Sequence, residues 1–181
     1  DASEELEAVA DTTQTPIAHS LMGKGAVRDD HPLVLGMTGF WGTELVNQAC
    51  LNAETIFAIG TRFKEADCSS WYPGYTFNVP GSKIIHVDIE PSEIGRNYPT
   101  EIGVVADAKA ALTVLNRVAN RQFPQGRPTN PTTAAISDFR KTFVASNAEH
   151  ATSNAFPMMP ERILADVRKA LPADGILTTD V

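Results

Sequence analysis

Residues 83–88 read Lys-Ile-Ile-His-Val-Asp, and residues 55–59 read Thr-Ile-Phe-Ala-Ile just before Gly60. Short, almost uninterrupted apolar runs of this kind are typical of strands buried on both faces of a parallel sheet. Parallel neighbours need a long crossover, and the spacing between these runs leaves room for one. The pattern predicts an α/β fold with an open, mostly parallel, Rossmann-like sheet and helices on both of its faces.

The same alternation continues outward from these two runs. Asp107 and Ser3 are placed to cap helices, because their side-chain oxygens can accept from the first free backbone N–H groups. Pro91 suits the first position of a helical turn that reaches Ile94. The other expected elements are strands over 15–20 and 103–106, helices over 44–51, 108–120 and 132–147, a helix opened by Pro160, and the start of a strand at 176–180.

A break in the pattern at residues 122–131, which hold three prolines and a glycine, predicts a linker. The linker separates an α/β domain over 1–121 from a segment over 132–181 that is helical and then starts a strand. The chain opens at Asp1 without a methionine, and it stops one residue after the expected strand. Both features favour a segment of a longer protein.

The composition is that of a folded globular protein, with 43% hydrophobic and 20% charged residues. The 181 residues carry 15 basic and 22 acidic side chains, a net charge of −7, which argues against binding to nucleic acid or to an anionic membrane. No apolar run reaches the roughly 18 residues that a membrane span needs. Only two cysteines are present, Cys50 and Cys68, so we expect a reducing, cytoplasmic setting without disulfides.

Ligands of open parallel sheets bind where the strands end, at their carboxyl edge. Five segments are expected there: 21–24, 39–42, 60–63, 88–90 and 106–107. Glycines among them permit close approach of a ligand to the backbone. Arg62 can pair with a phosphate through its forked donors, and Asp88 can accept from ribose hydroxyls or an adenine amine. Together these segments predict a groove shaped for a dinucleotide.

Each of these features also has a purely structural interpretation. Neither common glycine-rich phosphate fingerprint occurs, so the glycines can be turn residues and Arg62 a solvated charge. Asp88 can cap the turn at Pro91, and Phe40 and Trp41 can pack in the core rather than stack on a flat ring. The four histidines lack metal-ligand spacing, His86 fits a hydrogen-bonded position in a strand, and no acid–base–nucleophile set assembles. We predict neither a metal site nor a catalytic residue in this chain.

The order of the segments carries a resemblance to a known family. Residues 16–25, 30–33, 35–43, 60–63, 86–97 and 106–109 resemble the central domain of thiamine-diphosphate-dependent enzymes, nearest to the acetolactate-synthase-like branch. Residues 157–181, through Pro160-Glu161-Arg162 and Thr178-Thr179-Asp180-Val181, resemble the opening of the next domain, which holds the diphosphate.

The resemblance implies three successive α/β domains, of which the first supplies a glutamate and the third a magnesium-binding stretch. Neither lies in this chain, so thiamine diphosphate and Mg are expected outside it, and the chain is expected to catalyse nothing alone. The parent would make or cleave carbon–carbon bonds as a transferase or lyase. Such central domains begin with a strand ahead of the helix at Ser3, so we expect the sheet to lack its first strand. We expect repair by homo-oligomerisation or by residues 176–179 of a neighbouring chain.

The resemblance also implies that this domain can hold FAD, as in acetolactate-synthase-like relatives, or ADP, or nothing. Phe40-Trp41 stands where FAD binders usually have Met-His, Lys64-Glu65 stands where they have paired aspartates, and Ala106 replaces a frequent glycine. A stand-alone nucleotide-binding module and a structural spacer are the alternative functions. The expected cofactor-lining residues are Met22, Gly23, Phe40, Trp41, Gly42, Gly60, Arg62, Asp88, Ile89, Ala106 and Asp107.

Overall fold

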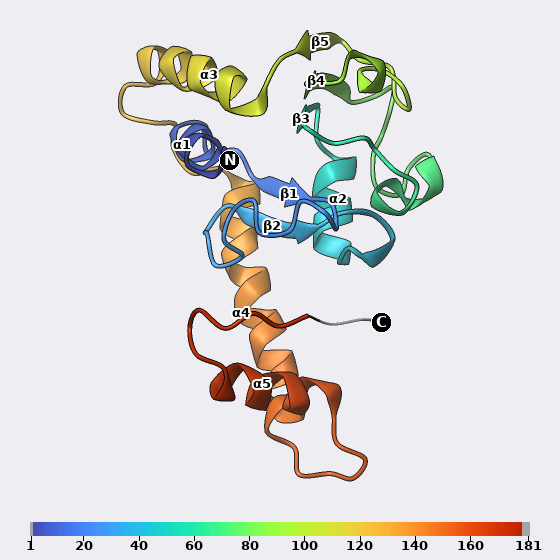
Figure 1. The fold of residues 1–181 in the computed structure, drawn as a ribbon, viewed down its shortest axis with the longest axis vertical. Coiled ribbons are helices and arrows are strands. Elements are labelled where there is room, and N and C mark those ends of the chain that lie inside the picture. The colour runs from blue at the N-terminus through green and yellow to red at the C-terminus, as the bar shows by residue number, and fades with distance from the viewer. Residues whose placement is uncertain (1, 179–181) are drawn as a thin grey trace. The chain divides into compact units, whose positions relative to one another are not determined.

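A computed structural model describes residues 2–178 as helices and parallel strands in alternation (Figure 1). The chain divides into two compact units, Asp1–Ile136 and Ser137–Val181. The main elements of the first unit are α1 (Ser3–Thr13), β1 (Ile17–His19), β2 (Val34–Met37), α2 (Glu44–Leu51), β3 (Thr55–Ile59), β4 (Lys83–Asp88), β5 (Ile102–Val105) and α3 (Ala108–Gln122), with short 3-10 helices at Gly39–Trp41, Ala66–Trp71 and Pro91–Glu93. The helix α4 (Pro131–Thr152) runs on into the second unit, which also contains α5 (Pro160–Ala170).

The strands form two open parallel sheets, which confirms the predicted α/β class. β4 lies between β3 and β5, with Ile56 paired to Ile84 and His86 paired to Gly103. β1 and β2 form a separate pair. The prediction of one sheet therefore differs from the structure at one place, because no described strand joins β1 to β3.

The hydrophobic core of the first unit sits on one face of β3 and β4. Its buried members come from the two strands and from the long loop between them, which folds its apolar side chains inward. Cys68, in this loop, is fully buried there. The core residues are Ala58, Phe63, Cys68, Phe77 and Ile84.

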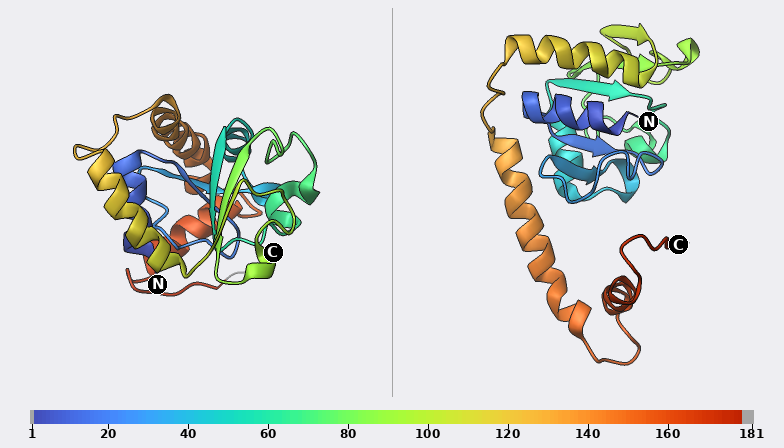
Figure 2. Two further views of the ribbon diagram at one scale, coloured as in Figure 1. Left: turned by 90° about the horizontal axis from the view of Figure 1, so that it is seen from above. Right: turned by 60° about the vertical axis from the view of Figure 1, so that its left-hand side comes forward.

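Helices α1 and α3 lie side by side on the first unit (Figure 2). The side chain of Asn116 donates to the backbone carbonyl of Glu5 at 2.8 Å, and Lys109 lies 3.3 Å from the Glu5 carboxylate. On α3, Leu112 is buried, whereas Val118 is exposed. The expected Ser3 cap is wrong, because α1 already begins at Ser3 and its N-cap residue is Ala2.

In the second unit, Arg162 connects α5 to the residues that follow α4. This side chain donates to the backbone carbonyl of Ser153 at 3.0 Å and to Asp166 at 2.6 Å, which ties the start of α5 to the segment before it. Ile163 and Leu164, on α5, are both exposed. Residues 175–178 are not a strand in the structure, and the rest of the expected strand lies outside the described residues.

Within residues 2–178, α1 to α5 include no helix with the length and apolar content that crossing a membrane requires.

Candidate functional site

Three of the predicted segments meet at the carboxyl edge of the β3–β4–β5 sheet. Parallel strands end at the same edge, so residues that follow them in sequence become neighbours. The backbone N–H of Gly60 donates to Val87 at 2.8 Å, and the N–H of Ala106 donates to Asp88 at 3.1 Å. The structure therefore brings Gly60, Asp88 and Ala106 together, as the sequence predicted.

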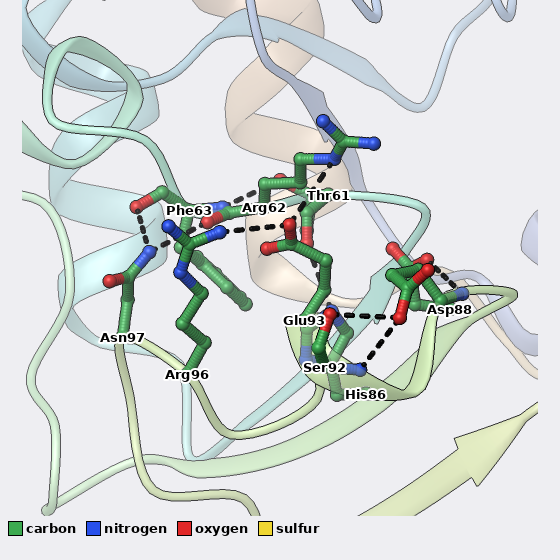
Figure 3. Close-up of polar contacts among 10 residues, drawn as sticks. Thr61, Arg62, Phe63, His86, Asp88, Ser92, Glu93, Arg96 and Asn97 are labelled. Atoms are coloured by element: carbon green, nitrogen blue, oxygen red, sulfur yellow. Dashed lines mark hydrogen bonds and ion pairs between the residues drawn. The ribbon is translucent and has the colours of Figure 1, made fainter.

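Arg62, in the loop after β3, forms an ion-pair cluster with Glu93 and Arg96 (Figure 3). The Glu93 carboxylate is only 7% exposed, and its Oε1 lies 2.9 Å from Arg96 Nη1 and 3.6 Å from Arg62 Nε. Its other oxygen, Oε2, is buried and has no hydrogen-bond partner among residues 2–178. Glu93 thus holds Arg62 by its Nε edge, while the Arg62 side chain as a whole stays 57% exposed.

Three side-chain hydrogen bonds to backbone carbonyls fix the loop that carries Arg62. His86 from β4 bonds the Thr61 carbonyl through Nε2 at 2.9 Å, as expected for a hydrogen-bonded strand histidine. The Asn97 amide donates to the carbonyls of Arg62 at 2.8 Å and Phe63 at 3.2 Å. These bonds fix the backbone of the loop, so that the freedom of Arg62 lies in its side chain.

The turn after β4 is organised by its own carboxylates. Asp88 accepts from the N–H of Glu90 at 2.8 Å, and Glu90 accepts from the N–H and the hydroxyl of Ser92. The hydrogen bonds from the Ser92 side chain and backbone lower the pKa of the exposed Glu90 carboxyl. The cap of the turn at Pro91 is therefore Glu90 and not Asp88, and Ile89 between them is exposed.

Asp107 caps α3, because its carboxylate accepts from the N–H of Ala110 at 3.0 Å. This was the structural interpretation of the residue, and it leaves Asp107 engaged at the start of the helix.

The remaining predicted residues form a second group at the ends of β1 and β2. Met22 is exposed, and Gly23 donates to the Ser20 hydroxyl at 3.1 Å. Phe40 and Trp41 contact each other edge to face at 4.9 Å and are 69% and 54% exposed. The expectation that these two rings pack in the core is therefore wrong. Gly42 donates to the Gly39 carbonyl at 3.0 Å and closes the same turn.

A cavity of about 770 Å³ is lined by residues of both groups. Of the predicted residues, Met22, Gly23 and Gly60 line it, and the other eight do not. Most of the lining is apolar and comes from β1, β3 and the helices α1 and α2.

Two residues that shape the site were missed in the sequence. Glu93 pairs with Arg96 three positions later, a spacing that marks a helical ion pair, but nothing in the sequence links it to Arg62, 31 positions earlier. Asn47 is buried and holds Gly39 through two hydrogen bonds of 3.0 Å, to its N–H and to its carbonyl. Its neighbour Val46 is also buried in α2, but no spacing in the sequence links Asn47 to Gly39.

A family-wide sequence profile for the thiamine pyrophosphate enzyme central domain matches residues 1–115. The chain belongs to the thiamine pyrophosphate enzyme family. Glyoxylate carboligase of Escherichia coli O157:H7 is 35% identical over 183 aligned residues, which include all of this chain and 30% of the relative. A probable acetolactate synthase large subunit of Methanocaldococcus jannaschii is 42% identical over 114 residues, 63% of this chain and 19% of the relative. Acetolactate synthase of Mycobacterium bovis is 28% identical over the whole chain and 28% of the relative.

The chain thus spans less than a third of the length of these thiamine pyrophosphate enzymes, and the relatives contain further domains. Among the described residues of this family member, no three His, Cys, Asp or Glu side chains cluster as a metal site would require. The groups gathered at the sheet edge are a cation, carboxylates, glycines and exposed apolar surface. The cation and the carboxylates of this set can form charge-assisted hydrogen bonds with a ligand.

The two cysteines of this chain are expected to be unreactive in the folded protein. Burial raises the pKa of both Cys50 and Cys68 to about 12. Because the folded state favours the neutral thiol, this contribution to stability is complete below the unfolded pKa near 9 and is lost as pH rises towards 12. At pH 8 we expect labelling by a thiol-specific disulfide reagent to be roughly 100-fold slower in the native than in the unfolded protein. Rapid native labelling of either residue would contradict this.

Proposed function

We propose that this chain is the central domain of a carbon–carbon bond-forming or -cleaving enzyme of the acetolactate-synthase-like branch, and that its sheet edge binds an ADP moiety, either free or within FAD. The names of its relatives support the first part, since they include carboligases and acetolactate synthases. The observation that supports the second is that Gly60, two residues before Arg62, and Asp88 lie at the ends of neighbouring strands, at one edge of a parallel sheet.

Gly60 gives the backbone room for a phosphate. Its φ of +59° is one that L side chains rarely adopt, and a Cβ built there would find no atom within 4 Å. A ligand could therefore approach the strand end closely at this point. The sequence places Arg62 two residues later, within reach of the same space, and a guanidinium held by its Nε edge can still offer its terminal nitrogens to an anion.

The next strand end suits the nucleoside part of the ligand. Asp88 follows β4, and its carboxylate can accept from ribose hydroxyls or an adenine amine in addition to the N–H of Glu90. Ile89, with 71% of its surface exposed, offers apolar contact for a flat ring beside that carboxylate. The fit is thus to a diphosphate near Arg62 and a nucleoside near Asp88.

The further domains of the intact enzyme would hold thiamine diphosphate and Mg. The coenzyme, when bound there, supplies an ylid that serves as an electron sink for carbanion chemistry. The residues of this chain would bind and orient the nucleotide and catalyse nothing by themselves. We place the enzyme in the cytoplasm as a homo-oligomer, on the basis of its low cysteine content and the open edges of its sheets.

Thermal unfolding with a panel of ligands tests this proposal. We expect ADP and FAD to raise the unfolding midpoint saturably, and thiamine diphosphate with Mg to leave it unchanged. Arg62→Ala should weaken ADP binding about 10- to 100-fold, since it removes a charge-assisted contact. Lys64→Ala is the matched control, because it removes an exposed cation two residues away and should have little effect.

The outcomes separate the alternatives. A response to FAD alone would mean that the flavin is needed for binding, whereas equal responses to ADP and FAD would place recognition in the ADP moiety. A midpoint that no nucleotide changes would exclude the nucleotide site and favour the structural spacer.

A further inference from the structure

One segment after β4, residues 93–97, contacts Arg62 at two separate points. Glu93 Oε1 lies 3.6 Å from Arg62 Nε, and the Asn97 amide donates to the Arg62 backbone carbonyl at 2.8 Å. Gly95 lies between these two residues with a φ of +73°, a left-handed turn conformation that suits glycine. The segment therefore constrains both the backbone of Arg62 and the Nε edge of its guanidinium.

Glu93 is an unusual residue to find buried at this point. Its carboxylate is almost fully buried, and Oε2 lacks a hydrogen-bond partner anywhere in the described part of the chain. Burying a carboxylate is costly, and apolar residues often replace a buried ion pair without loss of stability. The stability of the fold thus does not explain a charge at position 93, whereas the contact with Arg62 gives that charge a role.

Arg96 supplies the charge that balances Glu93. Its Nη1 donates to Glu93 Oε1 at 2.9 Å, a charge-assisted hydrogen bond, whereas the contact between Glu93 and Arg62 is a longer ion pair (Figure 3). Two guanidinium groups and one carboxylate carry a formal net charge of +1. A carboxylate paired with Arg62 alone would cancel its charge. Arg96 therefore lets Glu93 hold Arg62 while a positive charge is left for an anion.

The outer part of Arg62 remains open to a ligand. The contact with Glu93 uses Nε, and the Arg62 side chain is more than half exposed, so its two terminal nitrogens can still donate to an anion. Glu90 also interacts electrostatically with Arg62, but it is exposed, and water and salt screen an exposed charge more than a buried one. Glu93 is therefore the carboxylate with most influence on where this guanidinium lies.

We propose that Glu93 is a positioning residue of the nucleotide site, and that Arg96 acts on the same site through Glu93 without touching the ligand. This inference rests on the nucleotide site proposed above. Glu93 holds the Arg62 guanidinium ready for a phosphate, so that the ligand does not have to order a long, flexible side chain when it binds. Arg96 keeps the net charge of the three side chains positive.

Calorimetric titration of the full chain with ADP tests this with a variant that keeps the net charge. Glu93→Gln combined with Arg96→Gln removes one carboxylate and one guanidinium, so the charge of +1 remains and only the hold on Arg62 is lost. We expect ADP to bind about 3- to 10-fold more weakly, the cost of ordering one flexible side chain. Equal affinity of the parent chain and this double variant would overturn the inference.

Arg96→Gln alone tests the balancing charge, at a position that is 61% exposed and tolerant of substitution. It should weaken ADP binding about 3- to 10-fold, because an uncompensated Glu93 then neutralises Arg62. Lys64→Gln is the matched control, since it removes an exposed cation from the loop after β3 and should leave the affinity unchanged. Equal affinities of these two variants would overturn the role of Arg96.

A double-mutant cycle shows whether the effect passes through Arg62. A lysine ammonium cannot offer one edge to Glu93 and two further nitrogens to a phosphate. In the Arg62→Lys background, the paired substitutions at 93 and 96 should therefore change ADP affinity less than about 2-fold. The same loss in both backgrounds would mean that they disturb the site as a whole, which overturns the inference alone. A parent chain that binds neither ADP nor FAD would overturn the nucleotide site itself, and the inference with it.

Discussion

Replacing Phe63 with alanine is expected to lower the free energy of unfolding of the first unit by about 3–5 kcal/mol. Its ring is 5% exposed and is surrounded edge to face by Phe77 at 5.7 Å, His86 at 5.4 Å and Tyr98 at 5.3 Å. Alanine would leave a cavity at the centre of these rings, and partial collapse of the site would recover only part of the lost packing.

The same substitution would also loosen the loop that carries Arg62. The Phe63 carbonyl accepts from the Trp71 indole at 2.7 Å and from Asn97, so the position of its backbone depends on a well-packed ring. We therefore expect weaker nucleotide binding together with the loss of stability. A variant that lost stability and kept its full ADP affinity would show that the loop does not depend on the ring.

Chemical denaturation followed by tryptophan fluorescence measures this effect in the right unit, because both tryptophans, Trp41 and Trp71, lie in the first unit. Tyr72→Ala is the control, since it removes an aromatic ring that is mostly exposed in the same loop region. Its cost should stay below about 1 kcal/mol. A comparably small loss for Phe63→Ala would mean that Phe63 does not anchor the core.

The strands β3 and β4 were predicted residue for residue, because buried parallel strands leave a continuous apolar signature. β2, at Val34–Met37, was missed. Its run is only four residues long and contains Gly36, which weakens a strand pattern, and only Val34 is buried. Local pattern therefore sufficed for the central sheet and failed where a strand is short and half-buried.

Local pattern likewise predicts some residues of the candidate site and fails for others. The glycines, Arg62 and Asp88 could be predicted because they follow strands, and position in a parallel sheet decides which residues meet. The contact of Arg62 with Glu93 depends on how two loops fold over the sheet edge, which no spacing in the sequence encodes. The exposure of Phe40 and Trp41 likewise follows from the tertiary position of their turn.

The turn that carries Phe40 and Trp41 should be destabilised strongly by a substitution at Gly39. Gly39→Ala is expected to cost about 3 kcal/mol or more, because the added Cβ would lie 2.1 Å from the Ala66 carbonyl oxygen and 2.4 Å from the Asp67 carbonyl carbon. Both neighbours are backbone atoms and cannot turn aside as a flexible side chain would. Relief requires the turn to move, which would break the two hydrogen bonds between Gly39 and Asn47.

Gly74→Ala separates this contact from the strain of the backbone itself. Gly74 has a φ of +82°, close to the +79° of Gly39, but no atom lies within 4 Å of its added Cβ. It should therefore cost only about 1 kcal/mol, the penalty of a left-handed alanine. The close contact at Gly39 joins the turn after β2 to the loop after β3, and the Leu21 N–H also donates to Asp67 of that loop at 3.2 Å. Gly39→Ala should therefore displace Phe40 and Trp41 and shift the fluorescence emission of Trp41. Equal losses for the two variants in chemical denaturation would show that the close approach at Gly39 is not what holds this turn against residues 66–67.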